Sequence, residues 1–196
     1  MSNSLYHGLL SLILLAPYIA TVQWRKAMSR KIFIWSVSGI IVLMCIQMSI
    51  QSVQLWNEYS NDPVAAYLLP PHSNVVYSHI LRLGQPILVA VITALVTFSV
   101  LYFAKKYFRL GQYDAEDIRW LSLSALLSSW PGVLITFVSI FLIAVLAQIV
   151  RVLMAMRSSA EPPRLVLTPF VAPVTIFILW FLPDILHVTG LEKIRF

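Results

Sequence analysis

The sequence predicts an all-α polytopic membrane protein of about six transmembrane helices, with bounds estimated from the ~20 residues that cross a bilayer. Three observations support this: its composition, its apolar runs and the placement of its charges. Of its 196 residues, 59% are hydrophobic and 11% are charged, and the mean hydropathy is +0.82. Such values are typical of a chain that folds in lipid. There is no internal repeat or low-complexity tract, so we interpret 1–196 as one membrane domain.

The first span follows a stretch without basic residues and has no small-residue cleavage site after it, so we expect it to be retained rather than removed as a signal peptide. The fourth span ends at "SSWPG", where proline and glycine favour a break between two apolar segments. The expected bounds of the six spans are 5–23, 32–53, 84–104, 118–131, 133–155 and 166–186.

Basic residues gather in alternate connections between these spans. The segments 25–31, 105–119 and 151–164 hold 11 of the 14 Lys and Arg residues. By the positive-inside rule these segments face the cytoplasm, and both termini face outward. The net charge of +6 is therefore a topology signal, and no nucleic-acid partner is predicted.

The segment 54–83 is predicted to be an outer loop between the second and third spans. Its aromatic rings suit the headgroup region of a membrane, where amphipathic rings settle. They are Trp56, Tyr59, Tyr67 and Tyr77. The two histidines of this loop do not have the spacing of a standard ligand set, so no metal site is predicted.

A polar stripe runs along the outer half of the second span, formed by Gln47, Gln51 and Gln54. Amide groups in lipid must find hydrogen-bond partners, so this face is expected to point inward. We interpret the stripe as a set of contacts between helices, without a catalytic role.

The fourth span is short. From Ile118 to Pro131 it would measure about 21 Å at 1.5 Å per residue, so we expect its ends to lie within the protein rather than in lipid. Asp117, Ser124 and Ser128 stand at positions i, i+7 and i+11, which share one helix face. This face is either a small-residue packing surface, which we favour for the serines, or a polar seam that leads to Asp117.

Three of the 8 acidic residues, Asp114, Glu116 and Asp117, stand at the start of this span. Carboxylates in the first turn stabilise the positive end of a helix, and Asp114 is a natural N-cap. Capping accounts for Asp114 and Glu116. Asp117 shares the face of the serines, and acids within a membrane are candidates for function, so it is the first candidate site residue.

Six spans, a short fourth helix opened by an aspartate, and a Pro-Phe entry to the last span together resemble the type IV prepilin peptidases. These are membrane aspartyl peptidases of the Gly-x-Gly-Asp type, with preflagellin and Tad-system relatives. The family's Gly-x-Gly-Asp-x-Lys motif falls on "DAEDIR", with Asp117 at the catalytic aspartate. Its Gly-Pro-Phe-Leu-Ala segment falls on "TPFVA". The resemblance implies a groove for a pilin-like helix, and we assign to it Ser124, Ser128, Pro169 and Phe170.

One departure from the family pattern bears on catalysis. The family's first aspartate lies at the cytoplasmic end of span one, and Gln23 takes its place here. No shift of alignment restores it, because no Asp or Glu precedes Glu58. Aspartyl peptidases use two carboxylates that share a proton. Since glutamine cannot ionise, the site is expected to lose most of the roughly 10²–10⁴-fold that general acid–base catalysis supplies.

We therefore predict a degenerate prepilin-peptidase-like protein of a bacterial inner membrane, without independent proteolytic activity. It would bind a pilin-like helix or scaffold a pilus or type II-like secretion assembly. One alternative is an active aspartyl peptidase that cleaves prepilin leaders, with Asp114 or a partner subunit as the second acid. Another is a small structural subunit of an unrelated membrane complex. The cysteine-bearing methyltransferase domain of long-form relatives has no counterpart here, so no cofactor is predicted.

Overall fold

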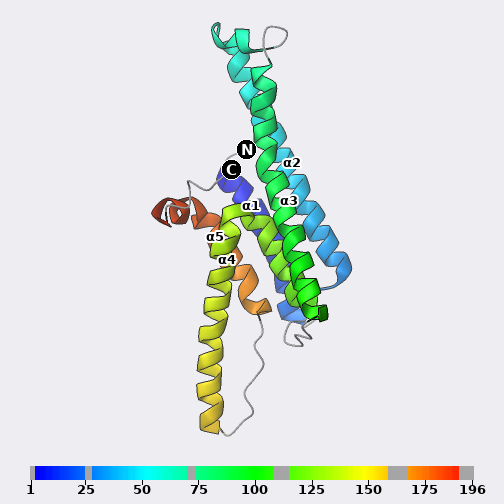
Figure 1. Cartoon of the computed structure of the whole chain (residues 1–196), viewed down its shortest axis with the longest axis vertical. Coiled ribbons are helices and arrows are strands. Elements are labelled where there is room, and N and C mark those ends of the chain that lie inside the picture. The colour runs from blue at the N-terminus through cyan, green and yellow to red at the C-terminus, as the bar shows by residue number, and fades with distance from the viewer. Residues whose placement is uncertain (1–2, 25–27, 70–73, 108–114, 159–166, 190–196) are drawn as a thin grey trace.

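The computed structural model describes residues 3–24, 28–69, 74–107, 115–158 and 167–189 (Figure 1). These residues are almost entirely helical and include no strand, which confirms the all-α class. The elements are α1 (Asn3–Trp24), α2 (Arg30–Asn61), a short 3-10 helix η1 (Ala65–Leu68), α3 (Val75–Tyr107), α4 (Ala115–Ser158) and α5 (Thr168–Thr189).

In the described part of the chain, three helical segments are long and apolar enough to cross a membrane, and they indicate an integral membrane protein. They are Arg30–Asn61, Val75–Tyr107 and Trp130–Met154. Two other apolar helices, Leu5–Thr21 and Thr168–Leu182, are shorter. The predicted fourth span, 118–131, is the buried first part of α4.

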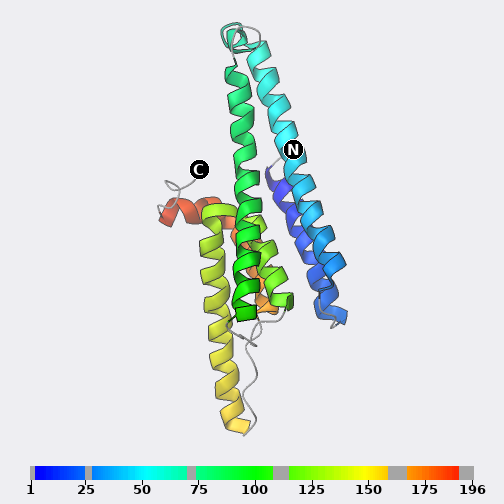
Figure 2. The ribbon, with the colours of Figure 1, turned by 45° about the vertical axis from the view of Figure 1, so that its right-hand side comes forward.

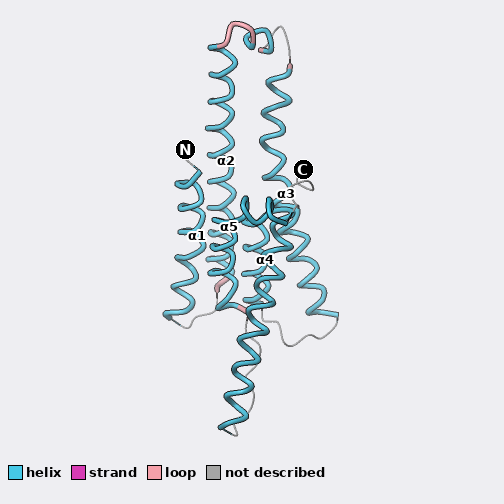
Figure 3. Tube along the Cα trace, turned by 90° about the vertical axis from the view of Figure 1, so that its left-hand side faces the viewer, coloured by secondary structure: helices cyan, strands magenta, loops and turns pink. Residues whose placement is uncertain are grey.

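α2 and α3 lie side by side and project beyond the other helices at one end (Figures 1, 2 and 3). The prediction of an outer loop over 54–83 was wrong, because the two helices continue through most of it. Hydropathy marks where lipid ends but not where a helix ends, and "QLWNE" contains good helix formers. α2 stops at Asp62, whose carboxylate accepts the backbone N–H of Val64 at 2.9 Å and that of Ala65 at 3.3 Å.

α4 turns back on itself near Trp130, although its backbone stays helical from Ala115 to Ser158 (Figures 1 and 2). We call 115–130 the first limb and 131–158 the second limb. The Thr136 hydroxyl is hydrogen-bonded to the Ser128 hydroxyl at 2.8 Å. Residues eight apart in a straight helix are separated by about 12 Å along the axis, so this bond requires a reversal. The break expected at "SSWPG" is therefore present as a fold-back of the chain.

Two residues at the reversal explain its position. Pro131 has no N–H to donate, and its ring clashes with the carbonyl of the preceding turn, which bends a helix. Gly132 permits the bend to approach α5 closely. A Cβ atom at Gly132 would lie 3.0 Å from two methyl carbons of Leu182. The reversal thus packs against α5 through a residue without a side chain.

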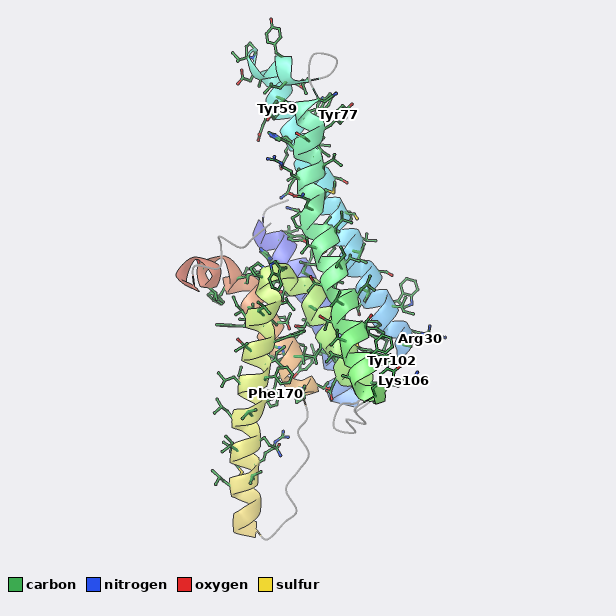
Figure 4. All side chains as sticks on the ribbon, in the orientation of Figure 1. Arg30, Tyr59, Tyr77, Tyr102, Lys106 and Phe170 are labelled. Carbon is green, nitrogen blue, oxygen red and sulfur yellow. The ribbon has the colours of Figure 1, made fainter. Side chains whose placement is uncertain are left out.

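The buried core lies between the first limb of α4, α5 and α1, with contributions from α2 and α3. Arg30 and Lys106 lie far along the α2–α3 pair from Tyr59 and Tyr77, while another aromatic residue, Tyr102, lies near Lys106 (Figure 4). Figure 4 shows Arg30 and Lys106 at about the level of Phe170, near the start of α5, and Tyr59 and Tyr77 at the far end of the α2–α3 hairpin.

Candidate functional site

Asp117 is held at the start of α5. It stands in the first turn of α4, and its side chain is only 4% exposed. Oδ1 accepts two hydrogen bonds from Thr168, one from the backbone N–H at 3.1 Å and one from the hydroxyl at 2.7 Å. Thr168 is the first residue of α5, where N–H groups have no partner within the helix. Asp117 therefore caps a neighbouring helix, whose positive end favours a carboxylate.

The ends of α1, α4 and α5 meet around this carboxylate. The Tyr18 hydroxyl of α1 donates to the Pro169 carbonyl at 2.9 Å. The Tyr18 ring also meets Trp120 edge to face, with ring centroids 6.0 Å apart and planes at 84°. Trp120 is fully buried. We call this cluster of Tyr18, Asp117, Trp120, Thr168 and Pro169 the junction.

Two further contacts join the start of α4 to its surroundings. The Arg119 guanidinium donates to the backbone carbonyl of Met28, a buried residue just before α2. The Trp120 indole N–H lies 3.4 Å from a Glu116 carboxylate oxygen. Arg119 thus joins α4 to the segment just before α2, whereas the Glu116 contact stays within the first turns of α4.

A row of paired polar groups continues from the junction along α4. The hydroxyls of Ser124 and Thr175 are hydrogen-bonded at 2.9 Å, and both residues are fully buried. Asp117 with Thr168 and Ser124 with Thr175 are matching pairs, because the partners on each helix are seven residues apart. The first limb of α4 and α5 therefore run parallel. We call these two pairs, with Ser128 and Thr136 at the reversal, the polar seam.

The seam supports the packing interpretation of the face shared by Asp117, Ser124 and Ser128. All three side chains are buried and hydrogen-bonded to another segment of the chain. Ser124 was predicted to line a substrate groove, but its hydroxyl faces α5. An internal helix occupies the space in front of Ser124, so this residue does not line an open groove.

The other predicted groove residues lie at two separate places. Pro169 and Phe170 are half-buried at the junction. Ser128 lies at the reversal, about 16 Å along the first limb from Asp117 at 1.5 Å per residue. These residues do not form a single groove within the described structure.

Gln23 lies near the end of α1, five residues after Tyr18, and so at the same end of the bundle as Asp117. Asp114 lies outside the described residues. Glu58, the first acid in the sequence, is exposed near the far end of α2. Glu116 adjoins Asp117 in sequence, and successive residues of a helix do not face each other. No carboxylate pair across two helices is therefore assembled among the residues that the structure describes.

Sequence reasoning missed the partners of the seam, although a signal was present. Thr168 and Thr175 repeat the seven-residue spacing of Asp117 and Ser124. Equal spacing of polar residues on two helices indicates that the helices can pair side by side in the same direction. Tyr18 and Trp120 carried no such signal, because isolated aromatics in apolar runs are common in membrane helices.

Replacing Ser124 by alanine and Thr175 by valine is expected to reveal a coupling of about 0.6 kcal/mol, and at most ~1.7 kcal/mol, which is the range for hydrogen bonds between membrane helices. The measurement is a double-mutant cycle on the free energy of unfolding in mixed micelles. Ser49 provides the control, because its exposed hydroxyl bonds a carbonyl of its own helix. If the coupling energy between Ser124→Ala and Thr175→Val equals that between Ser124→Ala and Ser49→Ala, the two seam hydroxyls do not interact.

Comparison of the chain with protein-family models, with curated proteins and with solved structures finds no match.

Proposed function

We propose that the chain is a prepilin-peptidase-like integral membrane protein without independent proteolytic activity. It binds a pilin-like apolar helix or scaffolds a pilus or type II-like secretion assembly in a bacterial inner membrane. It crosses that membrane six times, with both termini outside. One observation carries the proposal: Asp117, at the position that the resemblance assigns to a catalytic aspartate, has a structural role, because its Oδ1 caps α5.

The chemistry of the junction supports the inactive form of this function. A peptidase of the aspartyl type needs one carboxylate to activate water while a second donates a proton to the substrate carbonyl. Asp117 accepts two hydrogen bonds from Thr168, a residue of the same chain. Gln23 stands where the family has its other catalytic aspartate. A single carboxylate cannot act as base and acid in the same step.

The arrangement of the three helix ends supports the link to prepilins. The resemblance assigns family motifs to the end of α1, the start of α4 and the start of α5, and these three segments meet at the junction. Arg30, Lys106 and Phe170 lie at the same end (Figure 4). A pilin-like helix would approach this basic end from the bilayer.

A prepilin cleavage assay in membranes tests the inactive assignment. The native chain is expected to leave a co-expressed prepilin uncut, and Gln23→Asp is expected to restore cleavage by supplying the second carboxylate. The gain would draw on the roughly 10²–10⁴-fold contribution of acid–base catalysis. Gln23→Asn is the matched control, because it changes the side chain without adding an ionisable group.

Asp117→Asn then separates catalysis from folding, because an asparagine oxygen still accepts the Thr168 hydrogen bonds. The double variant Gln23→Asp with Asp117→Asn is expected to be silent. Cleavage by the native chain that disappears in Asp117→Asn would establish the active alternative and overturn the proposed inactivity.

Photo-crosslinking tests the proposed partner. With benzoylphenylalanine in place of Phe170, at the junction, crosslinks to a pilin-like helix are expected. The same group in place of Tyr77, which is exposed at the far end of the α2–α3 hairpin (Figure 4), provides the control. Crosslinks from Phe170 only to other polytopic membrane proteins would favour the alternative of a structural subunit.

A further inference from the structure

A half-enclosed cavity of 440 Å³ lies beside the reversal of α4. All five α-helices contribute to its walls, and it lies at the opposite end of the first limb from Asp117. Its volume is within the range of about 300–1,000 Å³ typical of small-molecule sites. A helix of about 10 Å diameter would fill it within roughly one turn, so the cavity does not fit a transmembrane segment.

Three buried polar atoms in the walls have no hydrogen-bond partner among the described residues. They are Gln47 Oε1, His7 Nδ1 and Trp130 Nε1, from α2, α1 and α4. The Gln47 side chain is only 7% exposed. Buried polar groups are almost always paired, so three orphans around one cavity point to a molecule that supplies their partners.

Gln47 was predicted to contact another helix, together with Gln51 and Gln54. Gln47 does point inward, but its oxygen reaches no neighbouring helix. Gln54 is exposed, so the inward prediction was wrong for that residue. The stripe therefore does not hold helices together at the cavity, which leaves Gln47 available to a ligand.

The other residues that line the cavity indicate whether the ligand is charged. Among the described residues, no Lys, Arg, Asp or Glu lines the cavity, and much of its surface is apolar, including Met44, Ile87 and Leu179. An ion taken from water into this site would have no opposite charge to pair with, and burying it would be costly. The ligand is therefore uncharged.

We propose that this cavity binds an uncharged amphiphile through a hydroxyl or amide head group. When the Gln47 amide and the Trp130 indole turn their buried polar atoms toward the cavity, the head donates a hydrogen bond to Gln47 Oε1 and accepts one from the Trp130 indole N–H. His7 Nδ1 donates or accepts according to its tautomer. The apolar part of the ligand packs against Met44 and Leu179. The site is independent of the proposed prepilin-related function, because it lies at the other end of the first limb.

Two kinds of membrane-soluble molecule share this chemistry, hydroxyl-headed lipids and alkylated quinols. The test uses a long-chain alcohol that carries a diazirine, added to the full-length protein in phosphatidylcholine nanodiscs. Labelled peptides are identified by mass spectrometry. Saturable labelling is expected at the start of α1 and at the reversal of α4. Competition by 1-hexadecanol and by an alkyl hydroquinone, compared at equal concentration, distinguishes the two sources.

Variants of the two head-group contacts provide the decisive comparison. Gln47→Leu and Trp130→Phe are each expected to reduce labelling about tenfold, which corresponds to roughly 1.4 kcal/mol in affinity. Gln54→Leu and Trp35→Phe are the matched controls, because both residues are exposed and neither lines the cavity. Labelling is expected to be unchanged in both controls.

A second readout does not depend on labelling. Without probe, Gln47→Leu is expected to raise the melting temperature by about 2–4 °C, because it removes a buried acceptor without a partner. The alcohol probe is expected to raise the melting temperature of the native protein but not that of Gln47→Leu. Three results would overturn the proposal. They are labelling that does not saturate, labelling that hexadecane reduces as much as 1-hexadecanol does, and labelling that persists in both Gln47→Leu and Trp130→Phe.

Discussion

Replacing Asp117 by alanine is expected to lower the free energy of unfolding by about 2–4 kcal/mol. The change leaves the backbone N–H and the hydroxyl of Thr168 without their acceptor at a largely buried helix start. An orphaned buried donor costs about 1–3 kcal/mol, and loss of a helix cap about 0.5–2 kcal/mol. The measurement is reversible unfolding of the protein from detergent micelles by SDS, followed by far-ultraviolet circular dichroism.

Two variants identify the source of that loss. Asp117→Asn keeps an acceptor oxygen and is expected to lose less than half as much stability as Asp117→Ala. Thr168→Val removes the hydroxyl and keeps the backbone N–H, so its effect is expected to fall between the two. Unfolding of Asp117→Ala within about 0.5 kcal/mol of the native chain, the usual range for a surface substitution, would contradict a capping role. That result would favour a catalytic role over a capping role for Asp117.

Replacing Trp120 by alanine is expected to cost about 3–5 kcal/mol, the range for removing a fully buried tryptophan from a core. Trp120 is 0% exposed and packs edge to face against Tyr18, so its loss opens a void where α1, α4 and α5 meet. The same SDS titration by circular dichroism reports the change without relying on tryptophan fluorescence.

Trp35 offers a matched control, because it is 77% exposed on α2. Trp35→Ala in detergent is expected to change stability by no more than about 0.5 kcal/mol. Trp120→Phe should fall between native and alanine, since it fills part of the void. Equal losses for Trp120→Ala and Trp35→Ala would mean that the junction does not hold the three helix ends together.

The helical class and the inward face of the first limb followed from the sequence. The long apolar runs leave helices as the way to satisfy the backbone in lipid, and the structure is all-helical in its described part. The shared face of Asp117, Ser124 and Ser128 depends only on helical periodicity, and all three are buried. Periodicity is a local property, so one sequence suffices to read it.

The features that the sequence did not reveal depend on contacts between distant segments. Asp117 meets Thr168 across 51 residues, and no local pattern states which helix an acid will cap. The ends of α2 and α3 depend on helix propensity beyond the lipid, whereas the predicted bounds were drawn from hydropathy. The cavity is formed by residues from five helices, so it exists only once they are packed.

The reversal of α4 also bears on how the chain enters a bilayer. Both ends of α4 point toward the same end of the molecule (Figure 1), so the helix can insert as a hairpin whose two limbs enter together. Its tip, "SSWPG", is uncharged, while its charged residues lie near the entry and exit, at Glu116, Asp117, Arg119, Arg151 and Arg157. Insertion therefore carries no charge of α4 through the hydrocarbon, a step that would be costly.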